Sequence, residues 1–186
     1  MYDAIILGAR CAGSPTAMLL ASQGYKVLLL DRAAFPSHLP HGHFIHRGGP
    51  RQIQKWGLLD DLIAAGCPPV TTFQQSIDDL ALTGTDLAVD GVAFGYGPRR
   101  DVLDKVLVDA AVDAGAELRE KFSVQEIFME GDTVAGIRGR DNDGSPTVTE
   151  RARIVIGADG RNSMLARAVQ APAYETMPTL LCWYFS

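Results

Sequence analysis

The sequence predicts an α/β fold with a mostly parallel sheet, and three observations carry this prediction. An apolar strand over residues 5–7 leads into the glycine-containing turn Gly8–Ser14, and a helix of small residues follows over 15–22. A second apolar strand spans 26–30, and a third apolar run, 153–156, again ends on a glycine-rich turn. Strands that alternate with helices in this way are typical of βαβ units, whose strands pair in parallel.

The bulk composition is that of an ordinary globular protein and argues against two classes of function. The chain has 186 residues, 47% of them hydrophobic and 21% charged, which is enough to bury a sizeable core. A net charge of −5 disfavours a nucleic-acid surface, which needs a basic face. No run approaches the roughly 18 apolar residues of a membrane span. Because the chain is predicted to enter a strand at once, no signal peptide is expected, and the three scattered cysteines favour free thiols in the cytoplasm.

The turn Gly8–Ser14 and the acid Asp31 have the layout of a dinucleotide site. Gly8 allows a tight exit from the strand, and Gly13 lets the helix lie close to the sheet, so that its N–H groups face a pyrophosphate. Asp31 follows the second strand, where it can accept hydrogen bonds from ribose hydroxyls. Arg10 replaces the middle glycine of the usual motif, so its side chain must turn away or join the site. The alternative is a βαβ unit without a ligand.

The middle of the chain predicts a change of architecture. Apolar residues recur at mostly helical spacing over 50–66, which predicts one helix. Two alternating runs, 77–82 and 87–94, are separated by a turn at 83–85 and predict antiparallel strands. A strong helix is predicted from Pro98 to the glycine at 115.

Beyond this helix, the pattern returns to strands. A strand begins at Glu117, and apolar residues continue into the next stretch. Runs over 134–138 and 148–151 flank a turn at 141–144, which predicts a β-hairpin. A further strand over 153–156 is of the buried type.

A second candidate site follows that strand. Asp159 stands at its carboxyl end, where open α/β sheets bind ligands, and the flanking Gly157 and Gly160 let a ligand approach the backbone. The alternative is a structural turn in which Asp159 or Ser163 caps a short helix predicted over 163–168.

Together these stretches resemble the N-terminal part of the flavoprotein hydroxylase superfamily, which includes p-hydroxybenzoate hydroxylase, geranylgeranyl reductase and the flavin-dependent halogenases. The matching stretches are Gly8–Ser14 with Asp31-Arg32, then Arg100–Asp104, then Gly157–Ser163. The resemblance covers nearly the whole chain and implies FAD as cofactor and NAD(P)H as electron donor. It also implies that the chain is the first part of a longer enzyme.

The resemblance implies a Rossmann-like FAD-binding domain, with a mostly parallel sheet and a β-hairpin insertion, over 1–72 and 99–170. Residues 73–98 and 171–186 are then an incomplete antiparallel portion of a substrate domain. The apolar run 179–185 is predicted to be a strand of that portion.

The resemblance also assigns roles to individual residues. Arg100 reaches the flavin phosphates or ribityl chain, although a surface arginine that pairs with Asp101 or Asp104 is the alternative. Val124 places backbone atoms against the adenine. The other implied cofactor-binding residues are Gly8, Ala9, Arg10, Cys11, Ala12, Gly13 and Ser14 for the pyrophosphate, Asp31 for the ribose, Arg32 directly after it, and Gly157, Ala158, Asp159 and Gly160 for FAD and NAD(P)H.

All four histidines lie in the connection after the second strand, and three hypotheses account for them. His41, His43 and His46 could ligate a metal, although no acid or cysteine lies near them in the sequence. The segment could also be a solvated loop. We favour a segment without metal that returns along the cofactor, so that His43 and His46 line the flavin and either donate hydrogen bonds to its reduced form or move protons.

The resemblance favours an FAD-dependent, NAD(P)H-dependent monooxygenase that acts on an apolar or aromatic small molecule. The alternatives are a geranylgeranyl-reductase-like enzyme that reduces double bonds and a flavin-dependent halogenase. A non-catalytic flavin-binding fragment is the alternative outside enzymes. No nucleic-acid partner and no membrane span are expected.

Overall fold

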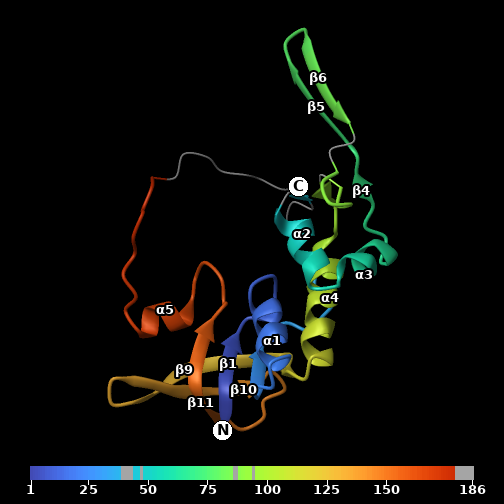
Figure 1. The fold of residues 1–186 in the computed structure, drawn as a ribbon. Coiled ribbons are helices and arrows are strands. Elements are labelled where there is room, and N and C mark those ends of the chain that lie inside the picture. The colour runs from blue at the N-terminus through green and yellow to red at the C-terminus, as the bar shows by residue number, and fades with distance from the viewer. Residues whose placement is uncertain (39–43, 47, 86–87, 94, 179–186) are drawn as a thin grey trace. The chain divides into compact units, whose positions relative to one another are not determined.

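The computed structural model describes residues 1–38, 44–46, 48–85, 88–93 and 95–178. The chain divides into two compact units. The first unit comprises residues 1–37 and 107–186, and the second comprises residues 38–106. Figure 1 labels many of the helices and strands of both units.

The first unit is built on a six-stranded mixed sheet with the order β8-β2-β1-β11-β10-β9. The pairs β1/β2, β2/β8 and β1/β11 are parallel, whereas β10 is antiparallel to both of its neighbours. This arrangement confirms the predicted α/β class. The strands are β1 (Tyr2–Leu7), β2 (Val27–Leu30), β8 (Glu117–Arg119), β9 (Phe122–Glu130), β10 (Thr133–Asp141) and β11 (Val148–Gly157).

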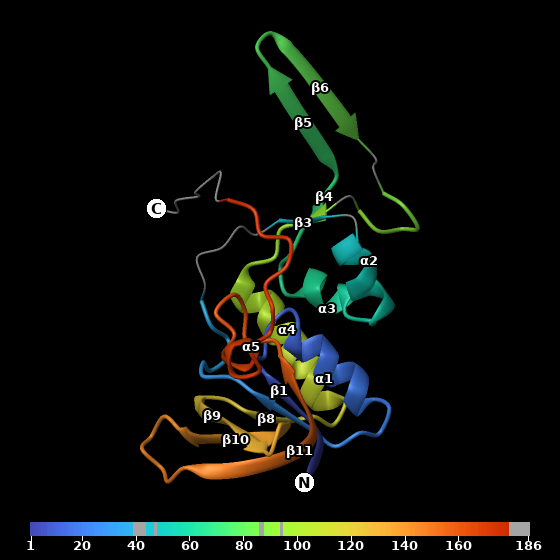
Figure 2. The same ribbon diagram turned by 90° about the vertical axis from the view of Figure 1, so that its left-hand side faces the viewer.

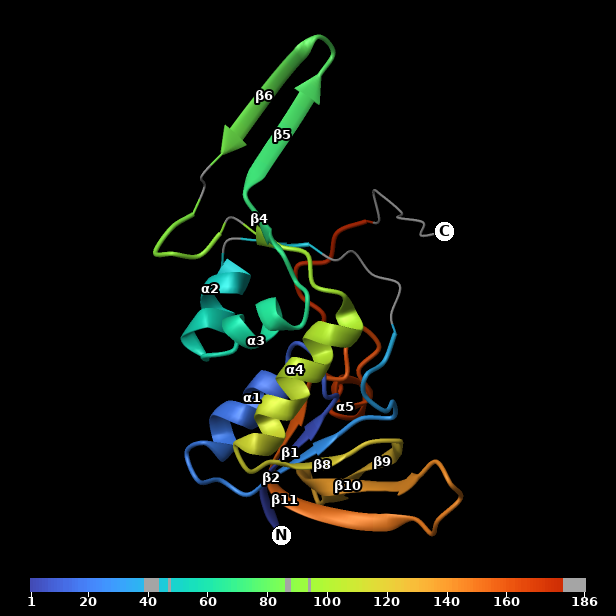
Figure 3. The ribbon, with the colours of Figure 1, turned by 90° about the vertical axis from the view of Figure 1, so that its right-hand side faces the viewer.

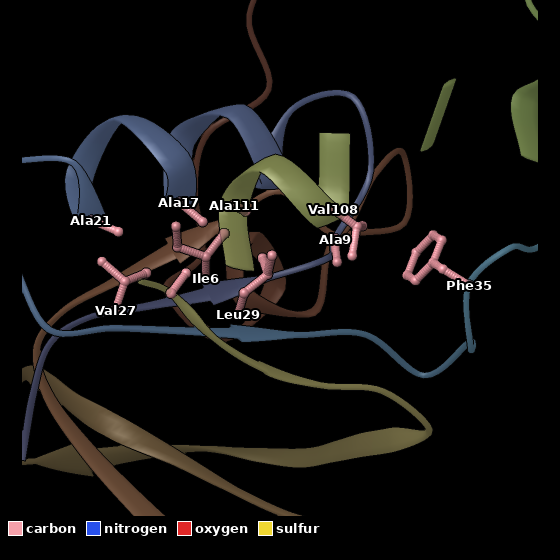
Figure 4. Packing of buried hydrophobic residues seen from close by; sticks show 10 residues of the cluster. Ile6, Ala9, Ala17, Ala21, Val27, Leu29, Phe35, Val108 and Ala111 are labelled. Atoms are coloured by element: carbon pink, nitrogen blue, oxygen red, sulfur yellow. The ribbon is translucent and has the colours of Figure 1, made fainter. Parts of the chain in front are cut away.

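Small side chains bring α1 (Gly13–Ala21) close to one face of this sheet. Ala17 is fully buried in a cluster with Ile6 of β1 and Leu29 of β2 (Figure 4). The same cluster includes Ala111 from the part of α4 (Arg100–Asp113) that belongs to this unit. Alanines at these contacts let helix and sheet backbones approach, which is what holds the turn before α1 at the strand ends.

The opposite face of the sheet carries a second core. Ile5 and Leu28 from the parallel strands are fully buried there against Phe122 of β9 and Ile137 of β10. Side chains of β9 and β10 therefore pack against this face of β1 and β2. Figure 3 labels β9 and β10 together with β11.

The predicted hairpin insertion is confirmed, with one difference in its second strand. Strands β10 and β11 pair from Gly136↔Arg151 to Gly139↔Val148. The runs 148–151 and 153–156 were predicted as separate stretches, but they form the single strand β11 because the buried Ala152 continues the strand between them.

In the second unit, the helix predicted over 50–66 is two helices. They are α2 (Gly48–Lys55) and α3 (Leu59–Ala64). Gly57, with φ +76°, takes a left-handed conformation that ends the first helix, and the N–H of Leu58 donates back to the carbonyl of Ile53 (3.0 Å). A small antiparallel sheet with the order β3-β7-β4 consists of β3 (Ile45–His46), β7 (Gly95–Tyr96) and β4 (Pro69–Val70).

The antiparallel ribbon of this unit has its turn elsewhere than predicted. Strands β5 (Thr72–Ile77) and β6 (Leu80–Thr85) are joined at Asp78-Asp79, with Asp78 at φ +49°. The strand predicted over 77–82 is therefore wrong. Apolar residues alternate on both sides of the two-residue turn, so the alternation does not reveal where the turn lies. Figure 1 shows the resulting two-stranded ribbon.

The second predicted strand, 87–94, does not form a regular strand over its described residues, 88–93. Val89 and Val92 form an isolated bridge around a turn at Asp90-Gly91. Residues 87 and 94 lie outside the described residues, as does the strand predicted over 179–185.

The described part of the first unit closes with a short helix, α5 (Met164–Ala168), which Figure 2 shows after β11. This position confirms the short helix predicted after Ser163. Within the described ranges, no helix has the length and apolar content to cross a bilayer.

Candidate functional site

The turn Gly8–Ser14 lies at the carboxyl ends of three parallel strands. The N–H of Gly8 donates to the carbonyl of Leu30 at the end of β2 (2.7 Å). The N–H of Ala158, just after β11, donates to the carbonyl of Leu7 at the end of β1 (2.8 Å). The two predicted glycine-containing turns therefore lie side by side, at the edge where open α/β sheets bind ligands.

Steric contacts explain both glycines of the first turn. A Cβ on Gly13 would stand 1.7 Å from the carbonyl oxygen of Gly8, and a Cβ on Gly8 would stand 2.4 Å from the carbonyl oxygen of Ala158. Gly8 also has φ +98°, which favours glycine. These backbones touch, so no side chain fits at either position.

Asp31 is 8% exposed and organises this turn from the end of β2. Its Oδ2 accepts a hydrogen bond from the N–H of Ala9 (2.8 Å), and its Oδ1 accepts one from the N–H of Ala33 (2.8 Å). Each carboxylate oxygen keeps a lone pair for a further donor such as a ribose hydroxyl. The contact with Ala9 was not predicted, because the sequence does not reveal which backbone groups meet the carboxylate.

The N-terminus of α1 provides a favourable electrostatic environment for an anion. Ala12 is the N-cap residue and provides no side-chain cap, and no acidic residue lies in the first turn. The helix dipole at this end is therefore not compensated by the helix itself. The fully buried hydroxyl of Ser14 has no hydrogen-bond partner among the described residues. A phosphate oxygen fits this buried donor.

Arg10 turns neither to solvent nor across the turn. Its guanidinium donates to Ser37 Oγ (3.3 Å) and lies over the ring of Phe35, 5.8 Å from the ring centroid. The segment after β2 thus anchors the arginine that replaces the middle glycine. Sequence analysis did not single out Phe35 or Ser37, and only their position shortly after Asp31 could have pointed to them. Cys11, in the same turn, is exposed.

The turn after β11 serves as a helix cap, as the structural alternative predicted. Asp159 Oδ2 accepts from the N–H of Met164 (2.6 Å), and Ser163 Oγ accepts from the N–H of Ala166 (3.0 Å). Asp159 also has a buried second oxygen, Oδ1, without a hydrogen-bond partner among the described residues. A buried carboxylate oxygen of this kind needs a donor, which a ligand hydroxyl or a bound water would supply.

The remaining predicted residues are placed as follows. Arg100 forms an ion pair with the fully buried Asp104 (2.9 Å), which is one of the two pairings that the alternative named. Val124 lies in β9, opposite Gly139, and packs against the second core. Arg32 is exposed directly after Asp31. The roles of Arg100, Arg32 and Val124 at a cofactor stay predictions.

The histidine segment is described only in part. His41 and His43 lie outside the described residues, and His38 is exposed. His46 lies in β3, with its ring stacked against Phe44 at 5.5 Å. The flavin-lining role of His43 and His46 therefore stays a prediction.

Comparison with known proteins places this geometry in a family. A family model described as an FAD binding domain matches residues 1–184. The chain belongs to this family. The glycine contacts, the Ser14 hydroxyl and Asp31 fit the pyrophosphate and ribose of FAD.

Named relatives of this FAD-binding domain include reductases and a halogenase. Digeranylgeranylglycerophospholipid reductase 2 of Methanopyrus kandleri is 33% identical, in an alignment that covers 97% of this chain and 43% of that protein. Geranylgeranyl diphosphate reductase of Rhodobacter capsulatus is 32% identical, covering 91% of this chain and 40% of that protein. The solved structure of the myxobacterial chondrochloren halogenase CndH has a TM-score of 0.76 and 26% identity, over 90% of this chain and 39% of that one. The chain thus spans less than half the length of these relatives.

Proposed function

We propose that this FAD-binding domain belongs to an oxidoreductase that reduces carbon–carbon double bonds of an isoprenoid substrate. The observation that carries the choice of reaction is the 33% identity to a digeranylgeranylglycerophospholipid reductase over nearly the whole chain. The 32% identity to a geranylgeranyl diphosphate reductase supports the same class. The site supports the cofactor, because the close backbone packing at Gly8 and Gly13 holds the N-terminus of α1 at the strand ends, where its N–H groups can bind a pyrophosphate.

The residues of this chain would bind and orient the cofactor. N–H groups at the start of α1 and the Ser14 hydroxyl hold the pyrophosphate, and Asp31 accepts from ribose hydroxyls. Arg10, anchored by Phe35 and Ser37, stands beside the pyrophosphate as a cation. When bound, FAD would supply the redox chemistry of the reaction. We propose NAD(P)H as the electron donor.

A flavin-dependent halogenase is the second candidate, and the likeness to CndH favours it. The monooxygenase favoured by the resemblance ranks below both, because the flavin-dependent monooxygenase PieE, whose solved structure is also similar, is only 19% identical to this chain. All three reactions start from the same reduced cofactor, so the FAD-binding domain alone is compatible with each.

Product analysis separates the three reactions. The full-length protein, loaded with FAD, is incubated without oxygen with NADPH or dithionite and with geranylgeranyl diphosphate or a digeranylgeranylglycerophospholipid. We expect mass spectrometry to show products with pairs of added hydrogens. A parallel incubation supplies air, halide and an aromatic substrate in place of the isoprenoid. Products that form only there, and carry oxygen or halide, would overturn the reductase proposal.

A further inference from the structure

The segment that follows β2 is held along the connection between β8 and β9. The N–H of Asp31 donates to the carbonyl of Arg119 (3.1 Å), and the N–H of Phe122 donates to the carbonyl of Asp31 (2.9 Å). The N–H of Lys121 donates in turn to the carbonyl of Ala33 (3.0 Å). Backbone pairing therefore fixes the segment as far as Ala33.

Beyond Ala33, a side chain of the same connection continues this hold. Glu120, which is half-buried between β8 and β9, accepts the N–H of Phe35 at its Oε1 (2.8 Å). Pro36 has no N–H, so Phe35 provides the last backbone donor before Ser37. The Glu120 carboxylate thus fixes the backbone two residues past the pairing at Ala33.

Phe35 and Ser37 both contact Arg10. Phe35 is 8% exposed and packs in the buried cluster with Ile6 and Leu29 (Figure 4), and the Arg10 guanidinium lies over its ring, 5.8 Å from the centroid. Ser37 Oγ accepts from the same guanidinium (3.3 Å). A displacement of the backbone at Phe35 would move both contacts, and with them the direction in which the guanidinium points.

We propose that Glu120 is a positioning residue of the FAD site. By fixing the backbone of Phe35, it holds the Phe35 ring and Ser37 where they orient Arg10 toward the pyrophosphate of FAD. Since backbone pairing already fixes the segment up to Ala33, the contribution of Glu120 falls on the residues that hold Arg10. The proposal rests on the role proposed above for Arg10 and is independent of the reaction that the flavin serves.

Reconstitution of the full-length apoprotein with FAD, followed by the quenching of flavin fluorescence, tests this role. Glu120→Ala removes the acceptor of one hydrogen bond, so we expect the Kd for FAD to rise about threefold to tenfold. Glu120→Gln keeps a carbonyl oxygen within reach of the Phe35 N–H and should bind FAD almost as tightly as the wild type. Loss of a negative charge near an anionic cofactor would by itself tighten binding, so charge alone predicts the opposite sign for Glu120→Ala.

A double-mutant cycle shows whether the effect runs through Arg10. Arg10→Gln should raise the Kd for FAD, and adding Glu120→Ala should change it little further, because the residue that Glu120 positions is already lost. Asp3→Ala is the matched control. Asp3 Oδ2 accepts the N–H of Lys26 (2.9 Å) at the amino end of the parallel strands, so this variant also removes one negative charge and one acceptor of a backbone N–H. It should lower the melting temperature without changing the Kd for FAD.

Four results would overturn the proposal: an unchanged Kd in Glu120→Ala, an equal loss of affinity in Glu120→Gln, an equal loss in Asp3→Ala, or full additivity of Glu120→Ala with Arg10→Gln. If Arg10→Gln leaves the Kd unchanged, the role of Arg10 falls together with that of Glu120. Should Glu120→Ala not fold, Glu120→Asp takes its place, because it keeps the charge and loses the reach to Phe35. The expected pattern of Kd values in a protein without reductase activity would support Glu120 and overturn only the proposed reaction.

Discussion

Asp31 combines two roles at the residue scale. Its carboxylate binds the N–H of Ala9 inside the phosphate-binding turn and the N–H of Ala33 after β2. The same group therefore shapes the turn and faces the place where a ribose would lie. Sequence spacing predicted the second role, but the first depends on how the turn folds back over the strand end.

The first prediction concerns this carboxylate. Asp31→Ala removes the acceptor for ribose and for the Ala9 N–H, and we expect FAD affinity to fall about tenfold to a hundredfold, as for charge-assisted hydrogen bonds. Asp31→Asn, which keeps one carbonyl acceptor, should lose less. Equilibrium titration followed by flavin fluorescence measures both, and unchanged affinity in the alanine variant would contradict the assignment.

Arg10 carries the second prediction. Arg10→Gly restores the commoner glycine motif but removes the cation that Phe35 and Ser37 hold beside the turn. If that cation contacts the pyrophosphate, FAD should bind severalfold more weakly and the loss should shrink at high salt. Tighter flavin retention in the glycine variant would show that the arginine only crowds the site.

Tyr2 gives a third prediction, from pH dependence. Two effects together raise the pKa of Tyr2 to about 12: burial, which is the larger, and the hydrogen bond that its hydroxyl donates to Glu117 Oε2 (2.7 Å). In the unfolded chain this tyrosine loses its proton near pH 10, about two pH units earlier. The free energy of unfolding should therefore fall as the pH rises from about 10 to 12. Denaturant titrations across this range should show a shallower fall for Tyr2→Phe than for the wild type.

At the scale of elements, the contact between α1 and the end of β1 is the tightest constraint on the site. Gly13 begins the helix and meets the carbonyl of Gly8, and the small Ala17 continues the close approach one turn later. The helix N-terminus is thus held where its dipole and N–H groups face a ligand. Any side chain at Gly13 moves the whole helix.

The fourth prediction tests that constraint. Gly13→Ala places a methyl group against backbone that cannot yield, so we expect about 1–3 kcal/mol of destabilisation together with loss of FAD. Gly48→Ala is the control, because its added Cβ meets nothing within 4 Å. Thermal unfolding of both variants gives the comparison, and equal melting temperatures would refute the steric argument.

At the scale of the molecule, each unit leaves apolar side chains exposed. Ile154 of β11 is 60% exposed in the first unit. In the second, Ile77, Leu80 and Leu82 of the β5–β6 ribbon are 58–60% exposed. They share one face of the ribbon, since Ile77 pairs with Leu80 and Leu82 lies opposite Gln75. Two-stranded ribbons are marginally stable alone, and exposed apolar edges favour association.

The fifth prediction follows from these surfaces. Residues 1–186 expressed without further chain should self-associate or be poorly soluble. Replacing both Leu80 and Leu82 with threonine should reduce the association, since threonine keeps β propensity without the apolar surface. Light scattering coupled to gel filtration measures the mass, and a monodisperse monomer of the unaltered chain would contradict the expectation.

The features that the sequence alone predicted are those whose determining residues lie close together in the chain. The glycines at 8 and 13, the acid at the end of β2 and the apolar strands around them belong to one βαβ unit, so a short stretch of sequence contains all its constraints. The hairpin insertion and the short helix after Ser163 follow in the same way from turn residues and caps. The mixed α/β class is determined by this pattern alone.

Tertiary contacts decided the rest, because their partners are far apart in sequence or are not distinguished by pattern. Arg10 meets Phe35 and Ser37 because the pairing of β2 with β1 brings the segments that follow these strands together. The position of the turn at Asp78-Asp79 depends on the register in which β5 pairs with β6. The alternation of apolar and polar residues is compatible with more than one register, so it does not determine this position. Arg119 of β8 pairs with Glu150 of β11, and Arg151 of β11 pairs with Glu130 of β9, although neither pair of strands is adjacent in the sheet. Charge pairing is a property of the folded surface, and the order of residues alone leaves it open.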